Sequence, residues 1–68
     1  MNISIELDRE VDGRWIAEVP ALPGVIVYGS TRSEAIAKAK ALALHVIADR
    51  MEHGEETSEF ESLTFAAA

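Results

Sequence analysis

Cysteine is absent from this 68-residue sequence, which excludes disulfide bonds and thiolate metal sites. Histidine occurs twice, at His45 and His53. On one helix these side chains would lie roughly 12 Å apart along the axis, too far to share a metal ion within a chain. The sequence therefore predicts no metal site and no cofactor. The missing cysteines favour a reducing compartment, for which the cytoplasm is the default.

Long apolar runs and basic residues are also scarce. No stretch approaches the roughly 18 apolar residues that span a bilayer, and residues 1–6 do not resemble a secretion signal. The sequence has six Lys and Arg residues and twelve Asp and Glu residues, which gives a formal charge of −6. That charge repels phosphate backbones and anionic membranes, so we expect neither nucleic-acid nor membrane binding, whereas a basic protein would be attracted. The competing interpretation is that the acidic surface serves solubility alone.

Catalytic patterns are missing as well. The serines form no Gly-x-Ser-x-Gly elbow, and the four scattered glycines form no phosphate loop. The carboxylates fall on outward strand positions or in a polar connector, where nothing encloses them. A chain this short buries about 60% of its unfolded surface, which leaves few residues to build a cleft. The sequence thus predicts a binding protein rather than an enzyme, in a single domain of residues 1–68.

The order of apolar and turn-forming residues predicts three strands before any helix. Residues 2–9 alternate apolar and polar side chains with the period of a strand. Asp12-Gly13 marks a hairpin turn, after which residues 14–19 continue the sheet. The two prolines, Pro20 and Pro23, make the next segment a fixed loop, because proline cannot donate to a ladder. Residues 25–28 then form the third strand.

A helix and a final strand complete the predicted fold. Thr31 and Glu34 form a capping box, which predicts a helix over residues 32–53 that Gly54 ends. A fourth strand is expected over about residues 61–66. Together these elements predict an α+β fold of β-β-β-α-β order, a small antiparallel sheet with one long helix packed on one face.

The predicted helix is apolar over more than half of its circumference. A helix that lies on one sheet needs an apolar stripe of little more than about 100°, so part of this surface should stay uncovered. The edge of the apolar arc supplies the candidate residues for an interface between copies: Ala37, Leu44, Ala48 and Met51. The alternative is that Phe60 or Phe65 folds over this edge within the chain. The sequence favours a dimer or higher oligomer.

Trp15 and Tyr28 are the single tryptophan and the single tyrosine, and they flank the proline loop. Aromatic side chains with one polar atom suit the centre of an interface. In a small domain, however, a lone tryptophan is more often the largest core residue. We therefore assign Trp15 to the core and keep Tyr28 as an interface candidate.

The middle of the sequence resembles the HicB-like antitoxin family of type II toxin–antitoxin systems. The resemblance is carried by an Asp-Gly turn, an aromatic residue, a Pro-x-Leu-Pro-Gly loop, a glycine before the helix and a Thr-x-x-Glu-Ala helix start, within residues 12–25, 28–29 and 31–35. It extends over essentially the whole chain. It implies a β-β-β-α-β arrangement similar to a truncated ribonuclease-H-like fold, without the metal-binding acidic site of that enzyme.

The resemblance also implies a function. Members of the family are antitoxins that cover a small basic HicA ribonuclease, and many carry a C-terminal DNA-binding domain. Because the sequence stops after the expected fourth strand, such a domain is not expected in this short form. The candidate toxin contacts are Glu6, Asp8, Glu18, Pro20, Leu22, Pro23 and Tyr28. The alternative function is a solitary HicB-like domain without a toxin, acting as a homo-oligomeric scaffold or a ligand-binding protein.

Overall fold

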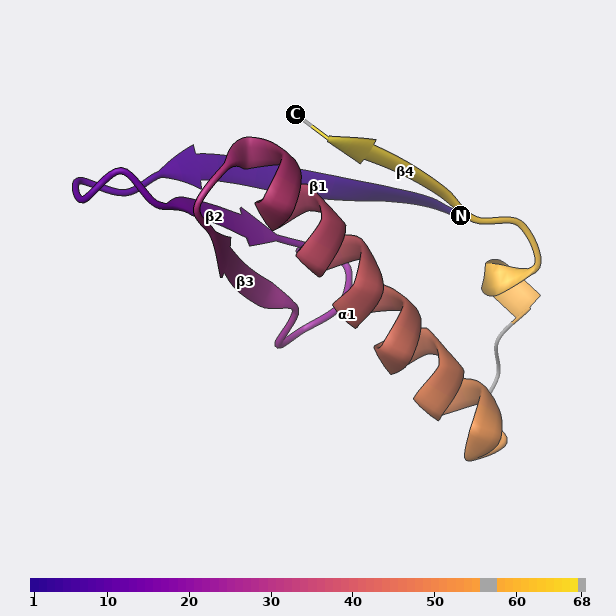
Figure 1. Cartoon of the computed structure of the whole chain (residues 1–68). Coiled ribbons are helices and arrows are strands. Elements are labelled where there is room, and N and C mark those ends of the chain that lie inside the picture. Colours follow the sequence, from indigo (N-terminus) through magenta and orange to yellow (C-terminus); the bar gives the residue numbers. More distant parts are fainter. Residues whose placement is uncertain (56–57, 68) are drawn as a thin grey trace.

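The computed structural model describes residues 1–55 and 58–67, which form a four-stranded sheet with one long helix across one of its faces (Figure 1). The elements follow in the order β1 (Asn2–Arg9), β2 (Trp15–Glu18), β3 (Ile26–Gly29), α1 (Arg32–Glu52), the 3-10 turn η1 (Ser58–Phe60) and β4 (Thr64–Ala67). The predicted α+β fold of β-β-β-α-β order is confirmed. The molecule is elongated, 41 × 19 × 15 Å, because α1 extends beyond the sheet.

The sheet has the strand order β3-β2-β1-β4 and is mixed. β1 pairs antiparallel with β2, and β2 pairs antiparallel with β3, as expected. β4 instead runs parallel to β1. The prediction of a wholly antiparallel sheet is therefore wrong at this edge. α1 carries the chain from β3 across to β4, and a helical crossover of this kind returns the chain parallel to the strand it left.

The last strand begins later than predicted, at Thr64 rather than near residue 61. Phe60 first closes the turn η1, and its ring is buried against the core. Residues 61–62 then form a bend that brings the chain to the edge of β1. Residues 56–57 of the expected polar connector lie outside the described part of the chain.

The core lies between α1 and one face of the sheet. Its largest fully buried side chains come from β1 and from the loop that joins β2 to β3: Ile3, Ile5, Val19, Leu22 and Val25. The helix contributes mostly alanines: Ala35, Ala39, Ala43 and Ile47. Because alanine side chains are short, the axis of α1 lies close to the sheet. Trp15 is partly buried and packs against this core, in agreement with its assignment.

Both ends of α1 use the predicted caps. The backbone N–H of Glu34 donates to the Thr31 hydroxyl oxygen over 3.1 Å. The Glu34 carboxylate accepts in turn from the backbone N–H of Ser30, one residue before the N-cap. At the other end His53 is the C-cap, and Gly54 has a φ of 74°, the left-handed conformation that ends many helices.

Candidate functional site

The sheet face opposite α1 is the candidate surface for a partner. Along each strand, side chains alternate between the two faces, so the neighbours of buried residues point away from the helix. We call this surface the open face; its members are Glu6, Asp8, Ile16, Glu18, Ile26 and Tyr28. Ile26 and Tyr28 remain 48% and 42% exposed. The open face therefore combines apolar and acidic side chains.

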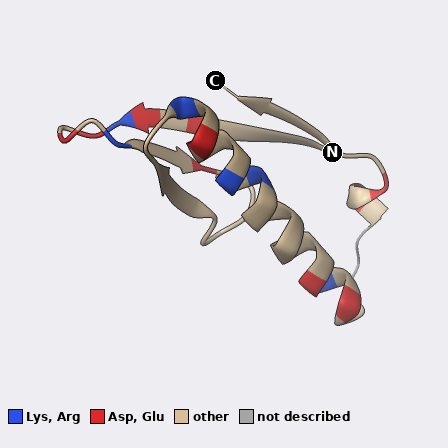
Figure 2. Ribbon diagram, viewed as in Figure 1, with Lys and Arg blue, Asp and Glu red and all other residues tan. Residues whose placement is uncertain are grey.

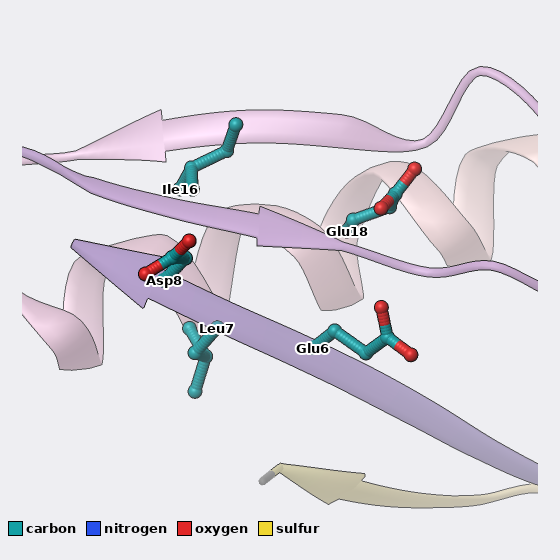
Figure 3. Close-up of a pocket in the computed structure, with 5 residues that line it drawn as sticks. All are labelled: Glu6, Leu7, Asp8, Ile16 and Glu18. Carbon is teal, nitrogen blue, oxygen red and sulfur yellow. The ribbon is translucent and has the colours of Figure 1, made fainter. Parts of the chain in front are cut away.

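Three carboxylates gather on β1 and β2 of the open face. Glu6 lies directly opposite Glu18 in the β1–β2 ladder, and Asp8 lies opposite Ile16. Figure 3 shows their side chains projecting from the two neighbouring strands. With Leu7 these four residues line a shallow hollow of about 470 Å³. Among residues 1–55 and 58–67, the ion pairs formed by Lys, Arg and His involve none of these carboxylates.

Arg9 and Arg14, close to the β1–β2 hairpin, contact residues other than these carboxylates. The Arg14 guanidinium lies over the Tyr28 ring, 4.8 Å from its centroid, and its Nε is 2.8 Å from an Asp12 carboxylate oxygen. The backbone N–H of Arg14, together with its side chain, lowers the pKa of Asp12. Arg9 lies over the Trp15 ring at 5.7 Å. In the described part of the chain, Arg9 and Arg14 therefore form no ion pair with the carboxylates of Glu6, Asp8 and Glu18.

Glu18→Gln is expected to stabilise the isolated chain by about 0.5 kcal/mol, because like charges directly opposite one another weaken a sheet. The substitution keeps the shape of the side chain and removes its repulsion with Glu6. Urea-induced unfolding measures the change, with Glu59→Gln, an exposed site off the sheet, as the matched control. Equal effects in the two variants would show that net charge, and not the opposed pair, sets the gain.

The proline loop is held by its own backbone. The N–H groups of Val19 and Leu22 donate to the carbonyls of Val25 and Val19, both over 3.0 Å. Pro20 and Pro23 are exposed at the surface, whereas Leu22 is 1% exposed. The expectation that Leu22 contacts a partner is therefore wrong, because the loop turns this side chain into the core. The sequence of the loop alone does not indicate that Leu22 points inward while Pro20 and Pro23 stay at the surface.

The free edge of the sheet at β3 is covered by a lysine from α1. The Nζ of Lys38 donates to the backbone carbonyl of Tyr28 over 3.2 Å and lies 3.1 Å from Glu34 Oε1. The hydrogen bond from Lys38 lowers the pKa of Glu34. Lysines at sheet edges hinder the addition of a further strand. We therefore expect a partner to bind on the open face rather than at this edge. The contact of Lys38 with β3 could not be inferred from helical periodicity alone.

The predicted candidates for an interface between copies all lie exposed along the outer side of α1: Ala37, Leu44, Ala48 and Met51. Leu44 and Met51 are 47% and 57% exposed. Phe60 is buried in the core, and Phe65 packs at its margin under Lys40. Neither ring covers the outer edge of the helix, so the prediction of an uncovered apolar surface is confirmed.

No metal-binding cluster of three or more His, Asp or Glu side chains occurs in residues 1–55 and 58–67. Within the same residues, no helix has the length and apolar character needed to cross a membrane. Both histidines lie exposed on the helix or at its end. The Nδ1 of His53 is 2.7 Å from the carbonyl oxygen of Asp49, and this hydrogen bond raises the pKa of His53.

Comparison with known proteins places the chain in a family. No family model matches the sequence. No solved structure matches it either. The UPF0150 protein Ta0767 of Thermoplasma acidophilum is 30% identical over 56 residues, which cover 82% of this chain and 81% of the relative. The similarity thus spans most of both proteins, and the chain belongs to the UPF0150 family.

Proposed function

We propose that this chain is an antitoxin-type binding module of the HicB-like kind, which neutralises a small basic ribonuclease by covering its RNA-binding surface. The sequence resemblance to HicB-like antitoxins and the membership of the UPF0150 family support this proposal. The observation that carries it is the opposed pair Glu6 and Glu18, with Asp8 beside them, on the sheet face that α1 leaves open.

The opposed carboxylates are suited to contact with a basic partner. In the isolated chain they repel each other, which weakens the β1–β2 pairing. A Lys or Arg from a basic partner would remove that repulsion and form charge-assisted hydrogen bonds with the same oxygens. The neighbouring Ile26 and Tyr28 supply the apolar contact area that a bound state requires, and Tyr is frequent among residues that dominate binding energy.

Inhibition by this arrangement requires no catalytic group. A ribonuclease that binds RNA through basic side chains presents the charge pattern that the open face complements. Once docked, the acidic face occupies the positions of RNA phosphates, so that substrate and antitoxin compete. The net charge of −6 also attracts a basic partner over a distance that shrinks as salt rises.

Glu6→Lys/Glu18→Lys is expected to slow association with the ribonuclease at least about tenfold at low salt and to flatten its salt dependence, because steering depends on charge at the docking face. The partner is first recovered from the native host by pull-down and identified by mass spectrometry, and its RNA cleavage must be blocked by the wild-type chain. Stopped-flow mixing then measures the association rate.

The matched control is Glu59→Lys/Glu61→Lys, which changes the net charge equally at exposed positions outside the sheet. Equal slowing in both double variants would remove the open face from the interface. A host in which no basic ribonuclease is recovered, while the chain associates with itself, would instead favour the second candidate, a homo-oligomeric scaffold. The exposed apolar side of α1 is the observation that keeps this candidate in view.

A further inference from the structure

The outer side of α1 carries a repeat that paired helices use. Its exposed residues recur at intervals of four, three, four and three, and we call them the seam: Ala37, Ala41, Leu44, Ala48 and Met51. This is the a/d spacing of a coiled coil. At about 100° per residue the seam lies on the opposite side of the helix from the buried alanines, so packing on the sheet does not account for it.

A hollow in this surface has the outline of a coiled-coil hole. Its volume is about 420 Å³, and it is lined by Ala41, Leu44, His45 and Ala48. These positions are i, i+3, i+4 and i+7, the four residues that surround one side chain inserted from a facing helix. The two alanines keep the hollow open, and a leucine is the kind of side chain that fills such holes.

We infer that two copies of this chain pair through their seams as antiparallel helices, with the two-fold axis beside Leu44. The hollow is centred between positions 44 and 45, so Leu44 of a second copy enters it when the axis passes there. In the same register, Met51 of the second copy meets the four residues at positions 34, 37, 38 and 41, which again have the spacing of a hole. The inference does not depend on the antitoxin role.

The distribution of charge along α1 selects the antiparallel direction. The first half of the helix carries more basic than acidic residues, and the last turns carry more acidic than basic ones (Figure 2). Lys38, Asp49 and Glu52 lie on the same flank of the seam. An antiparallel pair places Lys38 of each copy, whose Nζ also contacts Tyr28 and Glu34 in its own chain, level with Asp49 and Glu52 of the other copy. A parallel pair instead sets the two basic halves level with each other. Antiparallel helix dipoles favour the same choice.

The size of the seam sets the strength of the dimer. It extends over two heptads, about 21 Å of helix. A pair of that length buries less than the roughly 1,200–2,000 Å² of a standard interface. Two copies that each carry a charge of −6 also repel at long range. We therefore expect a reversible dimer with a dissociation constant on the order of 10 μM.

Sedimentation of the wild-type chain from about 1 to 100 μM is expected to show a concentration-dependent dimer. Leu44→Glu should raise the dissociation constant at least about tenfold, with an unchanged circular dichroism spectrum because the residue is exposed. Val11→Glu is the matched control: it adds the same charge at a fully exposed apolar residue on the hairpin, and the dimer should persist. A wild-type monomer at the highest concentration, or an equal loss of dimer in both variants, would overturn the inference. The seam would then be a candidate contact for a different protein.

The absence of native cysteine allows a direct test of direction. Under mild oxidation, Ala37→Cys/Met51→Cys should form a disulfide-linked dimer, because the antiparallel register brings position 37 of one copy beside position 51 of the other. Neither single variant should cross-link, since identical positions lie far apart on either side of the axis. Efficient cross-linking of both single variants would show parallel pairing and contradict the proposed arrangement.

Discussion

Gly29→Ala is expected to lower the free energy of unfolding by about 3 kcal/mol, the upper end of what overpacking usually costs. A Cβ added at Gly29 would lie 2.5 Å from the backbone nitrogen of Ala35 and 2.9 Å from its Cα. Both are backbone atoms near the start of α1, so no side chain can rotate away, and β3 must separate from the helix. A domain of this size has a total stability of only about 3–10 kcal/mol.

Urea-induced unfolding, followed by circular dichroism, measures this loss. Gly13→Ala is the control, because a Cβ there meets nothing within 4 Å, although its φ of 91° carries a backbone cost of about 1 kcal/mol. The variant at Gly29 should therefore lose clearly more than the variant at Gly13. Equal losses would show that the close approach of helix and strand is relieved by a small shift.

The features that sequence reasoning predicted correctly are those determined by neighbouring residues. The alternation through Ile3 and Ile5 defines β1 because successive side chains of a strand point to opposite faces, and only one of these faces is buried. Thr31 and Gly54 mark the ends of α1 because capping involves atoms within one turn. Such local signals can be identified in the sequence without knowledge of the tertiary structure.

The features that it missed depend on distant contacts. The parallel pairing of β4 with β1 joins residues near opposite ends of the chain, and a four-residue strand carries no mark of its direction. The Lys38 side chain of α1 reaches the carbonyl of Tyr28 at the edge of β3, a contact between two elements that the helix sequence alone does not indicate. The closeness of Gly29 to α1 is likewise visible only once the helix is placed on the sheet.

The candidate site was predicted in its chemistry but not in its register. Alternation places Glu6 and Glu18 on the outward face, yet their direct opposition depends on the hairpin between β1 and β2. In that hairpin the N–H of Glu10 donates to the carbonyl of Arg14, and the N–H of Gly13 donates to the carbonyl of Glu10. A turn one residue longer would shift the pairing and separate the two carboxylates.

The two proposed surfaces lie on opposite sides of the molecule. The open face is the side of the sheet that α1 does not cover, and the seam is the side of α1 that the sheet does not cover (Figure 1). A dimer formed through the seams therefore leaves both open faces exposed. Self-association and toxin binding would not compete, and the expected assembly is two antitoxin chains with two ribonucleases.

Leu22→Ala separates a structural role from a binding role within the proline loop. The Leu22 side chain is 1% exposed, and truncation of a buried leucine to alanine typically costs about 2–5 kcal/mol. We expect about 3 kcal/mol here, because the hydrogen bonds that tie Val19, Leu22 and Val25 together hinder collapse of the loop into the cavity. Pro23→Ala, at an exposed position of the same loop, should cost less than about 1 kcal/mol.

Binding kinetics should show the reverse order. Under conditions in which both variants are folded, Leu22→Ala should associate with the ribonuclease as fast as the wild type, because its side chain is not presented at the surface. Pro23→Ala alters a side chain that a docked partner could touch. Urea unfolding gives the stability of each variant and stopped-flow mixing gives its association rate. A Leu22→Ala variant of wild-type stability with weakened binding would return this residue to the interface and contradict the burial of its side chain.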